Sequence, residues 1–114
     1  MSDTLIRGNS MDGAIRVFAA VTTELVNEAH NIHSTNPVAS AALGRLLTGA
    51  VLMSAAGLKN ESDSLTLQIN GDGPLGRLVA VADSEQRVRG YVQNPYVDLP
   101  LNEKGKIDVG GGVG

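Results

Sequence analysis

The stretch PVASAALGRLLTGAVLMSAAGL, from Pro37 to Leu58, contains a single charged residue, Arg45. Apolar or small residues cover every side of the helix that this stretch predicts, and a helix that is apolar all round is buried all round. Pro37 suits the first position of a helix and disfavours a helical conformation at Asn36, so the helix should begin there. The stretch therefore predicts a long central helix in the core.

A membrane span is the alternative interpretation of the same stretch, because a helix of this length covers about 30 Å and would cross a bilayer. Arg45 lies near the middle of the stretch. An arginine there costs at least about 2.5 kcal/mol on insertion, and the surrounding Ala, Gly, Ser and Thr residues offset little of this cost. We therefore favour the core helix and expect no membrane partner.

Small residues at many positions of the stretch predict that strands pack closely around the helix. Gly44 and Gly49 each weaken a helix by about 1 kcal/mol relative to alanine. We therefore expect these glycines to be there because they let neighbouring segments approach the helix closely. On this interpretation, Gly49→Leu overpacks the core and lowers thermal stability.

Upstream of this helix, alternating residues predict a β-hairpin, from Thr4 to Asn9 and from Ala14 to Val21, joined across Ser10 to Gly13. Apolar residues occur on both faces of its second strand, so neither face is clearly exposed to water. From Thr22 the period becomes that of a short amphipathic helix that threonine can cap and that ends near His33.

Downstream, three alternating stretches separated by turns predict an antiparallel meander: residues 65–70, Arg77 to Asp83 and Arg87 to Gln93. The leucines and the isoleucine of the first stretch should face the core, and its polar residues should face water. Beyond Pro95 the chain is rich in turns, with one short extended candidate over residues 106–109. The glycine-rich residues 110–114 are expected neither to close an element nor to cap one.

Composition excludes several classes of function. The chain has 114 residues, which is one domain's worth, and it has no cysteine and a formal net charge of -3. It can therefore form no disulfide scaffold, no cysteine-ligated zinc site and no thiol nucleophile. The mild acidity provides no basic field for a nucleic-acid partner. The first ten residues lack the features of a signal peptide, so we expect a cytoplasmic protein.

The loop Gly71-Asp72-Gly73-Pro74-Leu75-Gly76 matches the glycine spacing of dinucleotide-binding loops and follows a predicted strand. Those loops work because the last glycine opens a helix whose N-terminus faces the pyrophosphate. Here the residues after the loop predict a strand, so we favour a turn whose glycines supply unusual backbone angles. A nucleotide-binding enzyme that uses Gly71 to Gly76 remains the alternative function.

Other candidate constellations are weaker. His30 and His33 lie three residues apart with Glu28 nearby, but no further ligand follows at a fixed offset, so a solvated helix end is favoured over a metal site. The serines lack the elbow motif of acyl-transfer enzymes, and the acidic residues fall in predicted turns. The arginines at positions 7, 16, 87 and 89 are expected to pair across strands. We therefore expect no catalytic, cofactor-binding or metal-binding residue and no enzymatic activity.

Several runs of this sequence resemble the N-terminal domain of the heat shock protein 33 family, the redox-regulated bacterial holdase chaperones. The similarity covers essentially the whole chain. It rests on Asp12-Gly13-Ala14-Ile15-Arg16-Val17, Thr22-Thr23-Glu24-Leu25-Val26-Asn27-Glu28, Pro37-Val38-Ala39-Ser40-Ala41-Ala42-Leu43-Gly44-Arg45, residues 65–76, Val88-Arg89-Gly90-Tyr91-Val92, Asn94-Pro95 and residues 101–106.

The resemblance implies an α+β fold in which antiparallel sheet elements pack around a long central apolar helix. It implies an ATP-independent holdase that binds unfolded client proteins under oxidative and heat stress, with residues 1–114 as the N-terminal part of the substrate-binding and dimerisation domain. Family members carry a C-terminal zinc domain with four cysteines, which this sequence lacks, so we expect zinc only in the full-length family member and an N-terminal fragment here.

The resemblance also implies a homodimer, because family members form dimers in which sheet elements are shared between subunits. Open strand edges likewise invite pairing, so we expect a homodimer or homo-oligomer. Together with the glycine patterns it points to structural rather than catalytic residues. These are Gly13, Gly44, Gly49, Gly71, Gly73, Pro74 and Gly76. The location of the client-binding residues stays open from sequence.

Overall fold

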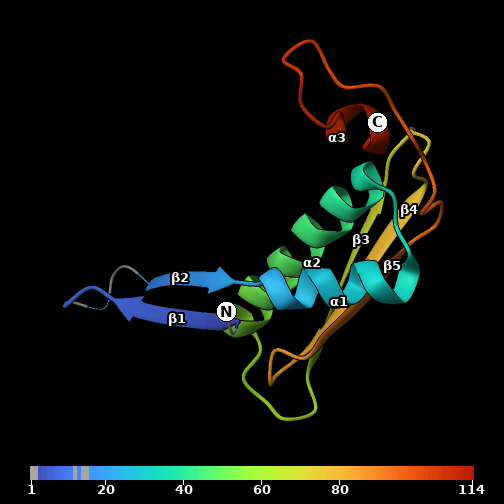
Figure 1. Cartoon of the computed structure of the whole chain (residues 1–114). Helices are drawn as coiled ribbons and strands as arrows, with labels where there is room; N and C mark the ends of the chain where they lie inside the picture. The colour runs from blue at the N-terminus through green and yellow to red at the C-terminus, as the bar shows by residue number, and fades with distance from the viewer. Residues whose placement is uncertain (1–2, 12, 14–15) are drawn as a thin grey trace.

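The computed structural model describes residues 3–11, 13 and 16–114. A long helix is flanked by a two-stranded and a three-stranded antiparallel sheet (Figure 1), which confirms the predicted α+β arrangement. The elements are β1 (Thr4–Asn9), β2 (Arg16–Val21), α1 (Thr23–His33), α2 (Pro37–Gly57), β3 (Ser64–Asn70), β4 (Arg77–Asp83), β5 (Val88–Val92) and α3 (Val109–Val113).

The core lies between α2 and the sheet β3-β4-β5, which is the predicted meander. Along β4, alternate residues Leu78, Ala80 and Ala82 are fully buried. The small alanines let the helix approach the sheet closely, as in other close-packed interiors. Gly90 on β5 has the same effect, because a Cβ there would lie 2.9 Å from Leu47 Cδ2.

The predicted positions of α1 and α2 are confirmed to within a residue, but the predicted cap of α1 is wrong. Thr22 makes no capping hydrogen bond; its hydroxyl instead lies 2.7 Å from the Thr48 hydroxyl of α2. The Asp3 carboxylate accepts hydrogen bonds from the backbone N–H groups of Glu24 and Leu25, both at 2.9 Å. A carboxylate at this end of a helix is stabilising, so Asp3 performs the role that sequence assigned to threonine.

The expectation that α2 is buried all round is also wrong. Ten of its residues are buried, but Arg45 and Met53 are exposed. Gly49 lies on this open side and a Cβ there would meet no atom within 4 Å, so the close contact predicted for Gly49 is absent. Gly44 does lie at a close contact, because its Cβ would lie 2.9 Å from Val26 Cγ1 of α1.

In the part of the chain that the structure describes, α2 is the one helix long and apolar enough to cross a membrane. Of its most apolar window, 56% is buried against the rest of the fold. The helix therefore packs as the core helix of this domain, as predicted, with one side left uncovered.

The hairpin β1-β2 projects from the body as an arm (Figure 1). Its register places Arg7 opposite Phe18, on the face that is held to the body: Arg7 Nη2 donates to Gln86 Oε1 at 3.3 Å and Arg16 Nη2 donates to the Ala56 carbonyl at 3.4 Å. The other face is apolar and exposed. The predicted hairpin is confirmed over the strands, whereas Asp12, Ala14 and Ile15 lie outside the described residues.

The end of the chain differs from expectation. Residues 106–109 form no strand, and the glycine-rich run forms the short helix α3, in which Gly112 is buried. The Asp108 carboxylate caps α3 by accepting the Gly111 N–H at 3.0 Å. The run can pack backbone to backbone because its glycines have no side chains in the way.

Candidate functional site

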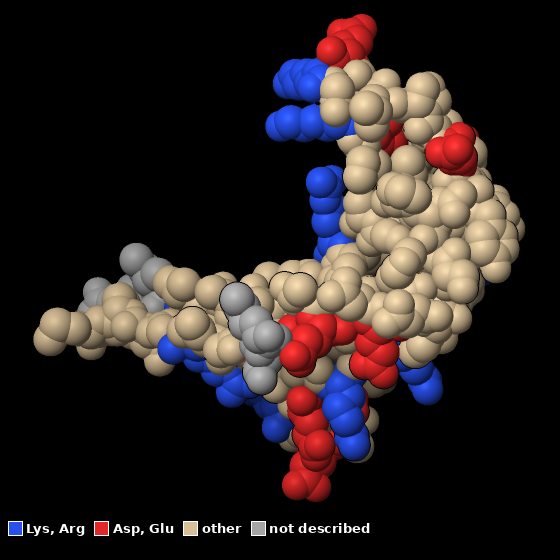
Figure 2. Space-filling model, viewed as in Figure 1, with Lys and Arg blue, Asp and Glu red and all other residues tan. Residues whose placement is uncertain are grey.

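The molecule is curved, and the inner side of the curve is hollowed (Figure 2). We call this inner side the concave face. It is bounded by the exposed face of the arm, the open side of α2 and the segment before α3. The hollows on it are lined by residues of α2, of β3 and of the segment before α3, among them Arg45, Gly49, Leu52, Ile69, Leu101, Lys104, Lys106 and Ile107. The exposed face of the arm carries Ile6, Val17 and Val21.

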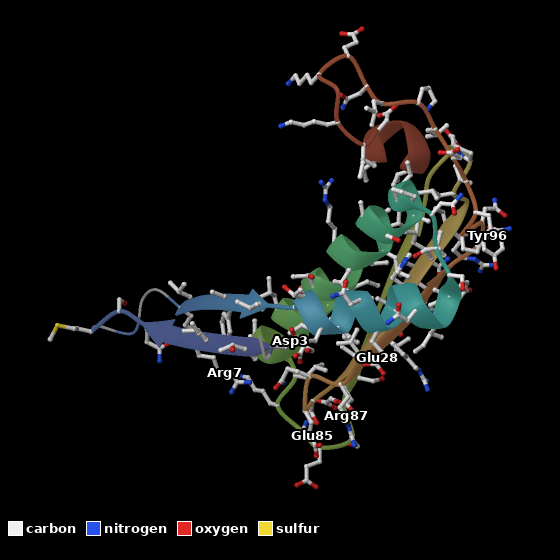
Figure 3. All side chains as sticks on the ribbon, in the orientation of Figure 1. Asp3, Arg7, Glu28, Glu85, Arg87 and Tyr96 are labelled. Carbon is white, nitrogen blue, oxygen red and sulfur yellow. The ribbon has the colours of Figure 1, made fainter. Side chains whose placement is uncertain are left out.

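The arm turns its apolar face toward this hollow. Ile6 is 60% exposed and Val17 is 57% exposed, and both lie on the face opposite to Arg7 and Arg16. Arg7 points away from the hollow in Figure 3. The arm therefore presents an apolar strip to the concave face and its cations to the outside.

Among the described residues, three hollows meet at Arg45. One of about 500 Å³ lies between α1 and α2, one of about 290 Å³ lies between α2, β3 and α3, and one of about 670 Å³ lies between α2 and residues 101–110. The first two are walled mainly by apolar and small side chains. Arg45 therefore stands at the centre of a continuous depression whose floor is the uncovered side of α2.

The charge of the concave face is mainly positive. Its lining includes Arg45, Lys104 and Lys106 and one carboxylate, Asp108, which already caps α3. None of the three cations makes an ion pair with a described residue. Most acidic side chains visible in Figure 2 lie on the outer and lower sides of the molecule. The arrangement can bind apolar groups and negative charges together.

A separate apolar hollow, of about 470 Å³, lies away from Arg45, between α1 and the strands β4 and β5. Glu28 and Arg89 are among its charged lining residues. Its lining comprises Leu25, Glu28, Ala29, Ile32, His33, Leu47, Val79, Val81, Val88, Arg89, Gly90 and Tyr91. With Ile32 68% exposed and Tyr91 43% exposed, this groove offers another place where an apolar side chain of a partner can be sheltered.

The loop Gly71 to Gly76 does not present the surface that a nucleotide needs. The Gly73 N–H donates to the Val113 carbonyl at 2.9 Å and the Leu75 N–H donates to the Gly112 carbonyl at 3.0 Å. A Cβ at Gly71 would coincide with the Val113 carbonyl oxygen, so α3 sits directly against the loop. The glycines serve a backbone contact within the fold, which removes the support for the nucleotide alternative.

Three further structural candidates, Gly13, Pro74 and Gly76, lie in turns outside the lining of the concave face. Gly76 has a φ of 72° and Gly13 a φ of 73°, a conformation that favours glycine. The Pro74 carbonyl accepts a hydrogen bond from Asn94 Nδ2 at 2.8 Å, which fixes the loop to the chain after β5. These residues shape turns and do not form a site together.

His30 and His33 are not brought together by the fold. His30 Nδ1 lies 3.2 Å from the Thr35 hydroxyl and 3.1 Å from the Ser40 hydroxyl, so it ties the end of α1 to the start of α2. His33 lines the groove beside α1 instead. Within residues 3–11, 13 and 16–114, no three His, Asp or Glu side chains form a metal-binding group.

The two arginines predicted to pair near β5 differ: Arg87, in the turn before the strand, forms an ion pair, whereas Arg89 forms none with a described residue. Arg87 Nε donates to Asp83 Oδ2 at 2.7 Å, and the Arg87 backbone N–H donates to Asp83 Oδ1 at 3.0 Å. These hydrogen bonds, with that of the backbone N–H first, hold the pKa of the Asp83 carboxyl below its usual 3.8. Arg89 instead pairs in register with Val81 and carries no ion pair with a described residue.

Sequence reasoning missed Arg45 as a site residue and treated it only as an obstacle to membrane insertion. The available signal was the charge itself. An arginine in an otherwise apolar helix must reach water, so the small residues one turn before and after it, Ala41 and Gly49, had to lie near the surface. Lys104 and Lys106 gave no signal, because only the course of the chain brings them to the same face.

Comparison with known proteins gives a consistent result. The family described as "Hsp33 protein" matches residues 3–114. The "33 kDa chaperonin" of Ruminiclostridium cellulolyticum is 53% identical over 109 residues, which is 96% of this chain and 37% of the relative. The protein of the same name from Clostridium beijerinckii is 50% identical over all 114 residues and 39% of its own length.

A solved structure agrees with these matches. The crystal structure of the 33 kDa chaperonin, a heat shock protein 33 homologue, from Thermotoga maritima superimposes with a TM-score of 0.88 and 45% identity. The match covers 95% of this chain and 37% of that one. The chain thus spans less than two fifths of the length of the relatives that it matches.

Proposed function

Because the chain belongs to the heat shock protein 33 (Hsp33) family, we propose that it acts in an ATP-independent holdase chaperone, which binds unfolded proteins and prevents their aggregation. Its relatives are named as chaperonins. The chain acts in this proposal by binding and not by catalysis, in the cytoplasm, with unfolded client proteins as partners.

The observation that carries the proposal is the apolar surface left open on the concave face. Ile6, Val17 and Leu101 are each more than half exposed. Leu101 lines a hollow beside the small residues of α2, and Ile6 and Val17 lie on the exposed face of the arm. Large apolar patches on soluble proteins mark binding sites, because burying apolar groups of a partner there is favourable. A non-native chain exposes the apolar groups that such a surface can shelter.

The redox regulation proposed for the whole protein has to reside outside these residues. The chain has no cysteine. In the described part, no cluster of His, Asp and Glu could replace cysteine thiolates around zinc. The residues present do not fit the metal, so no step of the proposed binding involves zinc.

We also propose that residues 1–114 supply the N-terminal part of the substrate-binding and dimerisation domain. The arm supports this proposal, because a two-stranded hairpin with an exposed apolar face is rarely stable unless something packs against it. Strands β3 and β5 each have a free edge within the described sheet and could pair with another chain.

Suppression of client aggregation tests the proposed function. We expect the 114-residue chain, without nucleotide, to reduce light scattering from a thermally unfolding client enzyme. A double variant, Ile6→Ser with Val17→Ser, should suppress less because it removes the apolar strip of the arm. Tyr96→Ser is the matched control: Tyr96 is 67% exposed but lies at the opposite side of the molecule (Figure 3).

Equal suppression of aggregation by the double variant and the wild type would show that the apolar strip of the arm does not bind clients. No suppression by the wild type at any ratio to client would contradict the holdase function of this chain. A rise in melting temperature with added nucleotide would instead restore the enzyme alternative, since a ligand that binds only the folded state raises stability.

A further inference from the structure

We propose that the concave face selects unfolded segments in which apolar residues are accompanied by carboxylates. This inference rests on the proposed holdase function and adds the chemical class of its clients. Arg45, Lys104 and Lys106 would recognise the carboxylates, and the apolar strip of the arm with Leu52 of α2 would shelter the apolar residues.

Three segments beside α2 carry exposed apolar side chains. The arm contributes Ile6 and Val17, β3 contributes Ile69, which is 37% exposed, and the segment before α3 contributes Ile107, which is 43% exposed. The open side of α2 between them is built of small residues and Leu52. A partner segment laid along α2 would therefore meet apolar groups on both flanks.

The charges add selectivity to this surface. Arg45 rises from the middle of the floor, and Lys104 and Lys106 extend from one wall of the same hollow. They make no ion pair with a described residue, and the Asp108 carboxylate beside them is bonded to the end of α3. Complementary charge on a partner is therefore the missing element, whereas a basic segment would be repelled.

The position of Arg45 strengthens its effect. Arg45 is exposed and stands between two mainly apolar hollows, so a segment whose apolar side chains enter them brings its carboxylates close to the guanidinium group. The arm's own cations, Arg7 and Arg16, lie on its other face and are engaged with the body. The positive field is thus concentrated inside the hollow and not spread over the whole arm.

The curvature of the face favours a polypeptide over a membrane. A lipid bilayer also offers apolar groups and negative charges, but a flat surface cannot follow the hollowed inner side of the molecule (Figure 2). A single strand or helix can enter such a hollow, with side chains in the depressions on either side of Arg45.

Fluorescence anisotropy with two peptides tests the inference. The peptides share one alternating leucine and valine core, flanked by glutamates in one and by lysines in the other. We expect the glutamate peptide to bind at least about fivefold more tightly to the wild-type chain, and the difference to shrink as salt rises, because exposed charge pairs are screened.

Charge-removing variants locate the effect. Arg45→Gln and the double variant Lys104→Gln with Lys106→Gln should each weaken binding of the glutamate peptide about two- to fivefold and leave the lysine peptide unchanged or tighter. Arg77→Gln and Lys59→Gln are the matched controls, because both are exposed cations outside the lining of the concave face. A circular dichroism melt of each variant verifies that it is folded.

The outcomes separate this inference from the proposed function. Equal affinity for both peptides, with binding intact, overturns the charge selection and leaves the holdase function standing. Absence of binding by either peptide counts against the holdase function itself. Tight binding to vesicles of anionic phospholipid that depends on Arg45 and exceeds peptide binding would overturn the polypeptide as the occupant.

Discussion

At the scale of single residues, glycines decide how closely segments of backbone approach one another. Gly71 and Gly73 lie against the carbonyl groups of residues 112 and 113, and the loop donates two backbone hydrogen bonds to them. Neither contact could be anticipated from the spacing of the glycines, which matches a phosphate-binding loop equally well. The function of the loop therefore depends on what packs against it.

We predict that Gly71→Ala lowers the free energy of unfolding by about 1–3 kcal/mol, because the added methyl group must displace the backbone of α3. Thermal unfolding followed by circular dichroism measures the effect. Gly110→Ala is the control, since a Cβ at Gly110 meets no atom within 4 Å and should be tolerated. Equal melting temperatures for the two variants would show that α3 does not rest on the loop.

A second residue-scale prediction concerns the turn between β4 and β5. The pKa of Asp83 is lowered from 3.8 in the folded protein, chiefly by the backbone N–H of Arg87. A lowered pKa means that the carboxylate stabilises the turn fully above pH 3.8, and that this contribution is lost as the pH falls through the lower folded value. Carboxyl NMR titration should give a midpoint below 3.8.

Arg87→Ala should raise that pKa only part of the way back, because the backbone N–H of residue 87 still donates to Asp83 in the variant. Arg77→Ala, far from the turn, should leave the Asp83 midpoint unchanged. A wild-type midpoint at or above 3.8 would contradict the hydrogen-bonded turn.

At the scale of elements, the two sides of α2 have different structural roles. One side packs against the sheet, where Leu43 and Leu47 are almost fully buried. The other side forms the floor of the concave face. The two internal glycines of α2 differ in their surroundings. Gly44 lies against Val26 of α1, whereas Gly49 faces the hollow and has no close neighbour.

We predict opposite effects of alanine at these two positions. Gly49→Ala should stabilise the protein by about 1 kcal/mol, because alanine favours the helix and meets no neighbour. Gly44→Ala should destabilise it, because the methyl group would lie 2.9 Å from a stiff valine side chain. Denaturant unfolding of both variants measures the difference, and a lower stability for Gly49→Ala than for Gly44→Ala would contradict the open side of α2.

At the scale of the whole molecule, the arm and the concave face leave several large apolar side chains exposed. Ile6, Val17, Met53 and Leu101 are each more than half exposed. The arm is tied to the body mainly through its outer face, by Arg7 and Arg16. Such a shape favours association with another chain.

We therefore predict that the chain self-associates as its concentration rises, with a homodimer as the simplest product. Size exclusion with multi-angle light scattering measures this. Ile6→Lys with Val17→Lys should shift the population toward monomer, since charges on the apolar strip oppose its burial. Tyr96→Lys, on the other side of the molecule, should leave the distribution unchanged. A wild-type chain that stays monomeric at high concentration would contradict the prediction.

Local patterns in the sequence were enough to predict most of the helices and strands. The uninterrupted apolar stretch and Pro37 located α2 to within one residue, and alternation located β3, β4 and β5. These signals are reliable because the period of a helix or strand is a property of neighbouring residues. Distinctive runs along the chain also pointed to its family.

Which surfaces are covered depends on the fold of the whole chain. It left one side of α2 open, brought Arg45, Lys104 and Lys106 to one hollow, and seated the glycine-rich end of the chain on the loop 71–76. No local pattern carries this information, because burial depends on contacts between segments far apart in the chain. An apolar helix can be buried against the rest of the fold on any of its sides. The sequence of α2 therefore does not indicate which side stays exposed to water.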